Sequence, residues 1–198
     1  MNELEVVKES IELAKDFIKM LAGPAVSEIG LYFQDQIKYF RSNNLISKIV
    51  KVQENCKKYN LTPNQIPLRT LIPLLDGASI EDNPELSEMW TNLITNTAIG
   101  KIKKVHHPSW AMILKQLSPE DALMFREVFN SSDAIVWESF KVSFAKKYNF
   151  TNEDVSFSFT NLMRLGLLYN TTKDGRSSIF KKNEFAKNFF DLVSSFEK

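Results

Sequence analysis

Cysteine is nearly absent from this chain, which has only Cys56 among its 198 residues. A single cysteine cannot form an intramolecular disulfide, so the sequence does not require an oxidising compartment. Long apolar runs are missing too. Residues 66–75 form the most apolar stretch, which is short and interrupted by Pro67 and Pro73, whereas a membrane span needs roughly 20 predominantly apolar residues. The N-terminus lacks the apolar core of a signal peptide. We therefore expect a cytoplasmic protein.

Charge of one sign is not in excess. The 25 Lys and Arg balance 24 Asp and Glu, for a net charge of +1, so no bulk attraction to nucleic acid or membrane is expected. The nucleophile-elbow, P-loop and dinucleotide-binding motifs are also missing. His106 and His107 are the two histidines, and with Cys56 they do not supply a zinc ligand set. We expect no catalytic residue, no metal and no cofactor, and therefore not an enzyme.

Helical spacing dominates the first hundred residues. Apolar side chains recur every three or four positions from Leu4 to Leu21, as on one face of a helix. Gly23 and Pro24 are expected to end that helix. Two further apolar series cover residues 26–40 and 45–59, as one bent helix or two. The apolar surface of these helices allows a homodimer as an alternative to packing within one chain.

Residues 68–78 predict a short apolar helix with Pro73 inside it, so we expect a kink or a start nearer that proline. The sequence Asp82-Asn83-Pro84-Glu85 is typical of a helix start. The apolar positions that follow predict an amphipathic helix: Leu86, Met89, Trp90, Leu93, Ile94 and Thr97. We expect Trp90 to anchor the core, since aromatic side chains bury large areas.

The composition changes near Gly100, from an acidic first half to a basic second half. We therefore expect two domains, an N-terminal helical domain over 1–100 and a second domain over 101–198. Capping boxes at Ser118 and Thr151 start two helices of the second domain, and Asp133 is the expected cap of a third. A β-hairpin around residues 173–175 and a last helix from Asn183 follow. This order predicts a mainly α fold: a helical bundle plus a winged-helix-like domain with one small hairpin.

Residues 66–94 resemble the abortive-infection alpha family, a domain of unknown function in bacterial and prophage proteins. The resemblance is carried by Pro73 to Ser79, Glu81-Asp82 and Glu85 to Leu93. It implies a role in phage exclusion, in which the infected cell stops growing or dies before phage matures, and a winged-helix-like C-terminal part. The signature positions, interpreted as structural or as a partner surface, are Pro73, Leu74, Leu75, Asp76, Gly77, Ala78, Ser79, Glu81, Asp82, Glu85, Leu86, Trp90 and Leu93.

Acidic residues cluster in this signature: Asp76, Glu81, Asp82, Glu85 and Glu88. One interpretation is a metal site or a general acid–base pair, which needs carboxylates that converge on one point. The favoured interpretation is that these acids stabilise helix N-termini, while the small residues at 77–79 let two helices pack closely.

Basic residues gather in the predicted hairpin, where Lys173, Arg176, Lys181 and Lys182 are possible nucleic-acid contacts. A winged-helix protein would read DNA with the helix over 151–165. The first turn of that helix carries Glu153 and Asp154, which oppose phosphate binding. DNA binding is therefore possible but disfavoured.

Three functional hypotheses follow. The favoured one is a non-enzymatic antiphage protein that acts through contacts with protein or other macromolecular partners. The alternative is a winged-helix transcriptional regulator. The least favoured is a metal-dependent enzyme that uses the acidic cluster.

Overall fold

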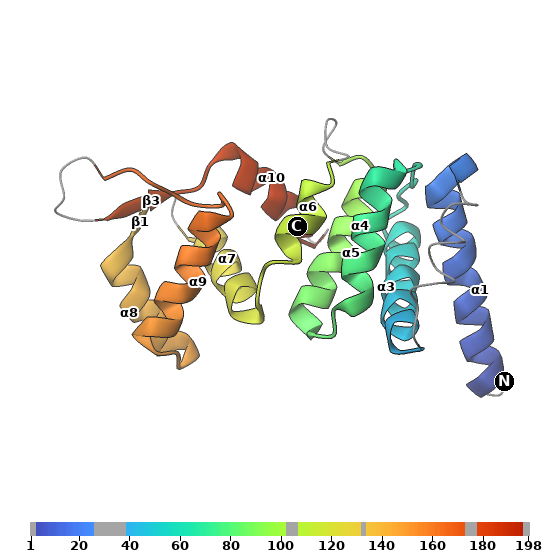
Figure 1. The fold of residues 1–198 in the computed structure, drawn as a ribbon, viewed down its shortest axis with the longest axis horizontal. Coiled ribbons are helices and arrows are strands. Elements are labelled where there is room, and N and C mark those ends of the chain that lie inside the picture. The colour runs from blue at the N-terminus through green and yellow to red at the C-terminus, as the bar shows by residue number, and fades with distance from the viewer. Residues whose placement is uncertain (1–2, 26–38, 102–106, 132–133, 173–177, 196–198) are drawn as a thin grey trace. The chain divides into compact units, whose positions relative to one another are not determined.

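A computed structural model describes residues 3–25, 39–101, 107–131, 134–172 and 178–195. Within those ranges the chain folds mainly into α-helices, with one 3-10 turn and three short strands (Figure 1). The mainly α fold class is therefore confirmed. The chain divides into two compact units, one of residues 1–115 and 192–198 and the other of residues 116–191. The boundary between two domains expected at residue 100 stays a prediction.

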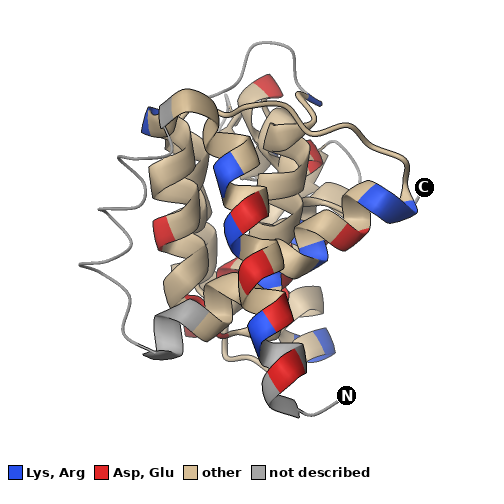
Figure 2. Ribbon diagram, turned by 90° about the vertical axis from the view of Figure 1, so that its right-hand side faces the viewer, with Lys and Arg blue, Asp and Glu red and all other residues tan. Residues whose placement is uncertain are grey.

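The first unit is a helical bundle. Helix α3 (Tyr39–Lys58) packs against α1 (Glu3–Ala22), α4 (Leu68–Ile80) and α5 (Pro84–Ala98), and the short α6 (Ser109–Leu114) packs on α4 and α5. The largest fully buried side chains of this unit are Leu21, Ile49, Ile66, Leu71, Leu74, Leu75, Trp90, Leu93, Ile94 and Leu114. Charged residues of both signs are distributed along α1 (Figure 2).

Local signals place most helix ends in this unit. Helix α1 ends at Ala22 and is followed by the 3-10 turn η1 (Gly23–Ala25), where Gly23 adopts a φ of 58° that suits glycine. Asn83 caps α5, since its Oδ1 accepts hydrogen bonds from the backbone N–H groups of Glu85 and Leu86. Helix α4 begins at Leu68 and continues through Pro73, so the expected start nearer that proline is wrong. The apolar series over 26–38 lies outside the described residues.

Helix α5 is buried on nearly all sides. Every residue from Met89 to Ala98 is buried, whereas Glu85 and Ser87 are half-buried and Glu88 is exposed, so the polar exposed part of α5 is confined to its first turns. Several of its polar side chains donate hydrogen bonds inside the protein: the hydroxyl of Thr95 donates to the Thr91 carbonyl one turn back. The amides of Asn92 and Asn96 donate to the carbonyls of Val193 and Leu192. Burial of these groups is tolerated because their hydrogen bonds are made inside the protein.

The second unit combines helices with a small sheet. Its elements are α7 (Pro119–Asn130), β1 (Ala134–Val136), α8 (Trp137–Tyr148), α9 (Asn152–Arg164), β2 (Tyr169–Asn170), β3 (Ile179–Lys181) and most of α10 (Glu184–Val193). The strands are antiparallel in the order β1-β3-β2, with Ile135 opposite Phe180 and Asn170 also opposite Phe180. Strand β1 adds a third strand to the expected hairpin, whose turn residues lie outside the described residues. The assignment to the winged-helix fold stays a prediction.

Both expected capping boxes are confirmed. Ser118 starts α7 and exchanges hydrogen bonds with Asp121, and Thr151 starts α9 in the same way with Asp154. Asp133 lies outside the described residues, and the N-cap residue of α8 is Val136, which makes no side-chain cap hydrogen bond. Among the helices of the described ranges, none is both long and apolar enough to cross a membrane.

Candidate interaction surfaces

The signature segment lies mostly in the core of the first unit. Gly77 on α4 faces Trp90 on α5, and a Cβ atom at Gly77 would lie within 2.9 Å of three indole carbons. Glycine at position 77 therefore lets the Trp90 ring approach the backbone of α4 this closely. The buried signature residues are Leu74, Leu75, Gly77, Ala78, Ser79, Leu86, Trp90 and Leu93, whereas Pro73, Asp76, Glu81 and Glu85 are half-buried and Asp82 is exposed.

The acidic side chains of the signature have separate partners. Asp76 forms a 2.8 Å ion pair with Lys115, and Glu81 accepts a hydrogen bond through Oε1 from the Asn83 backbone at 2.9 Å. Glu85 lies in the first turn of α5, where the positive end of the helix dipole favours an acid. Within the described parts of the chain, no group of three or more His, Cys, Asp or Glu side chains is placed to hold a metal ion.

Lys48 is a buried cation that the sequence analysis missed. It is 4% exposed, and its Nζ atom donates to the Glu81 carbonyl, at the end of α4, at 2.6 Å. Burial lowers the pKa of Lys48, although the nearby charge of Glu81 partly opposes this. Its spacing could have indicated its burial, since Lys48 lies between Leu45 and Val52 on the apolar face of α3. This lysine holds α3 against the α4–α5 corner.

A polar cavity of about 360 Å³ lies in the first unit between α3 and α5. Its lining carries charges of both signs and several neutral polar groups: Lys51, Glu54, Asn55, Lys58, Tyr59, Pro84, Glu88, Thr91, Asn92 and Ser195. Glu88 is the one member of the predicted acidic cluster among these residues. Because two acids and two bases line it, the cavity has no net preference for an anion or a cation.

Among the described residues, His107 and Cys56 belong to no group of three or more His, Cys, Asp or Glu side chains that could hold a metal ion. His107 accepts a hydrogen bond from the Ser109 backbone at 3.2 Å through Nδ1, and His106 lies outside the described residues. Cys56 is buried on α3, and burial raises the pKa of its thiol. A raised pKa keeps the thiol protonated at neutral pH, which is unfavourable for a nucleophile.

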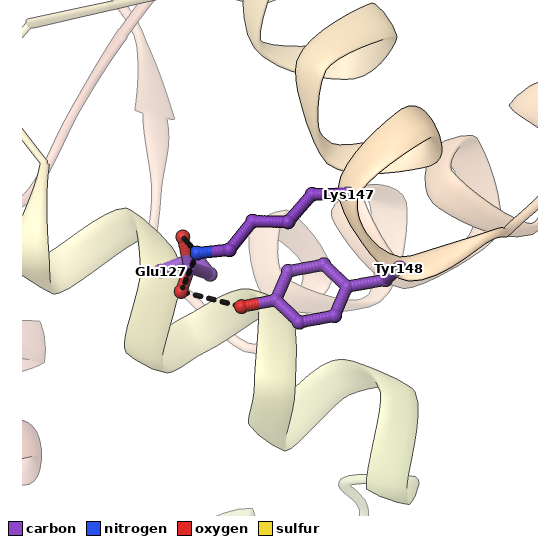
Figure 3. Close-up of polar contacts among 3 residues, drawn as sticks. All are labelled: Glu127, Lys147 and Tyr148. Atoms are coloured by element: carbon purple, nitrogen blue, oxygen red, sulfur yellow. Dashed lines mark hydrogen bonds and ion pairs between the residues drawn. The ribbon is translucent and has the colours of Figure 1, made fainter.

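Glu127, Lys147 and Tyr148 form a cluster that joins α7 to α8 (Figure 3). The Tyr148 hydroxyl donates to Glu127 Oε1 at 2.5 Å, and Lys147 Nζ lies 2.9 and 3.0 Å from the two carboxylate oxygens. The hydrogen bond from Tyr148, with that from Lys147, lowers the pKa of Glu127. Partial burial and the same hydrogen bond raise the pKa of Tyr148. Both shifts move away from neutrality, so the cluster is suited to joining helices rather than to acid–base chemistry.

The second cavity lies in the second unit, at the start of α7 and α9. It has a volume of about 490 Å³ and is lined by Ser118, Glu120, Asp121, Phe150, Asp154, Phe157, Ser158 and Asn161. Phe157 is 77% exposed. We call this set of residues the α9 pocket. Sequence reasoning missed it because Phe157 and Asn161 of α9 meet Glu120 of α7 only through helix packing.

The predicted nucleic-acid contacts are only partly described. Lys181 is exposed at the end of β3. Lys182 Nζ donates to the Ser131 carbonyl at 3.1 Å and lies 5.3 Å from the centre of the Phe129 ring, so it contacts its own unit. Lys173 and Arg176 lie outside the described residues. Asp154 accepts from the Thr151 backbone and hydroxyl, and those bonds lower the pKa of its carboxyl and keep it negative.

A family model described as abortive infection alpha matches residues 40–193. The chain belongs to the abortive infection alpha family. Membership indicates an abortive-infection-type role. Neither the curated proteins nor the solved structures contain a match to this chain.

The family match includes residues of both compact units. It starts in the first turn of α3 and extends to the end of α10, so the Gly77–Trp90 contact and the α9 pocket both lie within it. Helix α1 precedes the matched residues. The family assignment therefore concerns the signature core and the second unit together.

Proposed function

We propose that this protein is a non-enzymatic abortive-infection protein that acts in a phage-infected bacterial cell by binding another macromolecule. Its family membership supports the abortive-infection part. The exposed Phe157 in the lining of the α9 pocket is the observation that supports the binding part. An exposed aromatic ring in the lining of a cavity offers a partner a large apolar area to bury.

The polar groups of the molecule support the non-enzymatic part. Asp76 pairs with Lys115, and Glu127 holds Tyr148, so both carboxylates have structural partners. The pKa of Glu127 is lowered, and the pKa values of Tyr148 and Cys56 are raised. General acid–base groups and nucleophiles work best when their pKa lies near the working pH. The pKa values of these three groups are instead shifted away from neutral pH.

The test is phage restriction in bacteria that express the chain. We expect fewer plaques than in cells without the protein, and an early stop of growth in cultures infected at high multiplicity. A Phe157→Ser variant should restore plaque formation, because it removes the exposed ring. A Val142→Ser variant is the matched control, since Val142 is 60% exposed on α8 and does not line the α9 pocket.

Two results would count against the proposal. One is normal plaque numbers on cells that contain the folded wild-type protein. The other is hydrolysis of nucleotides, nucleic acids or peptide bonds at enzymatic rates by the purified chain. Loss of restriction in Val142→Ser as well as in Phe157→Ser would remove the role assigned to the ring.

DNA binding is the second candidate, supported by the exposed Lys181 and by the order of helices and strands in the second unit. It is weaker because Lys182 contacts its own unit and Asp154 places a negative charge at the start of α9. A salt titration separates the two, since phosphate contacts make the affinity fall as salt rises. We expect weak DNA binding that Lys181→Glu does not change; tight, salt-dependent binding lost in that variant would favour a regulator.

A further inference from the structure

Phe157 has the largest exposed fraction among the exposed large apolar residues described. Its helix, α9, packs on α7 and α8, with Val155, Phe159 and Leu162 buried. Phe157 lies two positions from both Val155 and Phe159, which places it on the opposite face of the helix. The packing of α9 therefore leaves the Phe157 ring exposed to solvent, where it lines the α9 pocket.

The α9 pocket is built from two kinds of groups. Phe150 and Phe157 supply aromatic surface, and the half-buried Phe150 is backed by Phe144, with 5.9 Å between the ring centres. The hydroxyls of Ser118 and Ser158 and the amide of Asn161 supply neutral polar surface. A space of about 490 Å³ accommodates at least one long side chain.

The charged residues that line the pocket are all acidic. Glu120 and Asp154 are exposed carboxylates, and Asp121 is buried. Asp121 accepts hydrogen bonds from the Ser118 backbone at 2.9 Å and from the Asn161 amide at 2.7 Å, which fix it inside the pocket. The described residues that line the pocket include no Lys or Arg. A phosphate group would be repelled here, and a cation would be attracted.

We propose that the α9 pocket binds a basic, partly apolar segment of a protein partner. A lysine or arginine side chain of that segment lies between the Phe157 ring and the carboxylates of Glu120 and Asp154. The ring face attracts the cation, the two acids neutralise it, and the aromatic walls cover its aliphatic stem. This assignment rests on the proposed function, because it names the chemistry of the partner that the second unit binds.

The probe is a short fluorescein-labelled peptide of alternating arginine and leucine, titrated with the full chain and followed by fluorescence anisotropy. We expect Phe157→Ser to weaken binding about tenfold, as truncation of a buried aromatic anchor does. Glu120→Gln should weaken binding less and should reduce its salt dependence. Asp121 and Asp154 stay unchanged, because both belong to capping boxes on which α7 and α9 depend.

Val142→Ser and Glu138→Gln are the matched controls, since both residues are exposed on α8 outside the pocket. They should bind the peptide within twofold of wild type. Equal weakening by Phe157→Ser and Val142→Ser, or equally tight binding of a glutamate–leucine peptide, would overturn the pocket assignment. Circular dichroism of each variant checks that it is folded.

The phage assay separates this inference from the proposed function. If the Phe157→Ser variant loses both peptide binding and phage restriction, the pocket assignment and the proposed function are both supported. If the wild-type chain restricts phage but does not bind the peptide, the pocket assignment falls and the proposed function remains. If the wild-type chain binds the peptide but does not restrict phage, the proposed function falls.

Discussion

Gly77 and Trp90 show how one missing side chain sets the packing of the first unit. The indole lies where a Cβ atom at position 77 would be, and both residues are buried. Small residues are used where two helices must approach closely, and a large ring then fills the space that they leave. The family signature is therefore, at these positions, a description of a core contact rather than of an exposed surface.

The first prediction concerns this contact. Gly77→Ala should lower the free energy of unfolding by about 1–3 kcal/mol, because the added methyl overlaps the ring in a dense core. Urea denaturation measures the change. Combining Gly77→Ala with Trp90→Phe should cost less than the sum of the two single changes, since the smaller ring makes room for the methyl. Strict additivity of the two costs would show that the ring and the methyl do not compete for the same space.

At the scale of elements, α7 and α8 are joined by a polar contact on the surface. Glu127 accepts hydrogen bonds from Tyr148 and Lys147, and these bonds lower the pKa of its carboxyl. A carboxyl whose pKa is lowered in the folded state stabilises the fold above its ordinary pKa of 4.5. That stabilisation is lost as the pH falls from 4.5 through the lowered pKa, because the carboxyl is then protonated in both the folded and the unfolded protein.

Tyr148→Phe tests this contact. At neutral pH it should lower the free energy of unfolding by about 1 kcal/mol, the ordinary contribution of one hydrogen bond. The difference from wild type should shrink as the pH falls below 4.5 and disappear below the lowered pKa, where Glu127 is protonated in the folded protein as well. Chemical denaturation over a pH series gives the curve. Tyr169→Phe is the control, since Tyr169 is exposed on β2; a pH-independent difference at Tyr148 would refute a role for the Glu127 charge.

At the scale of the whole molecule, residues about one hundred positions apart are joined by buried hydrogen bonds in the first unit. Asn92 and Asn96 of α5 donate to the carbonyls of Val193 and Leu192, at 3.1 and 2.7 Å. Carbonyls at a helix C-terminus have no partner within their own helix. The asparagines supply those partners, so the chain end is fixed to the most buried helix of the unit.

Asn96→Ala should therefore lower the free energy of unfolding by about 1–3 kcal/mol, since the Leu192 carbonyl loses a buried donor. Asn64→Ala is the matched control, because Asn64 is exposed before α4. Thermal and urea denaturation would measure the loss, and hydrogen exchange should increase at the C-terminal end of α10. An unchanged exchange rate there would mean that the amide does not hold this segment.

Local features of the sequence were enough to predict much of the fold. Asn83 starts α5, and Ser118 and Thr151 form their capping boxes, because these interactions involve residues only two or three positions apart. Strand β1 was missed because three residues form it only when β3 is alongside. The burial of Lys48 was missed because its partner, the Glu81 carbonyl, comes from another helix.

The candidate site illustrates the same limit. Asp154 could be interpreted as a cap from its spacing to Thr151, but its place beside Phe157 and Glu120 follows from the packing of α7 on α9. The exposed state of Phe157 could not be read from its position in the chain, since phenylalanine is ordinarily buried.

By itself, the sequence determined the mainly helical class, the main helix starts and the family of this protein. Those properties depend on the order and spacing of neighbouring residues. Only the tertiary structure decided that Gly77 makes room for Trp90, that α5 is buried with its polar groups, and that Phe157 is exposed beside carboxylates. Each of those outcomes depends on surfaces that meet when separate helices pack, and chain order does not specify which surfaces meet.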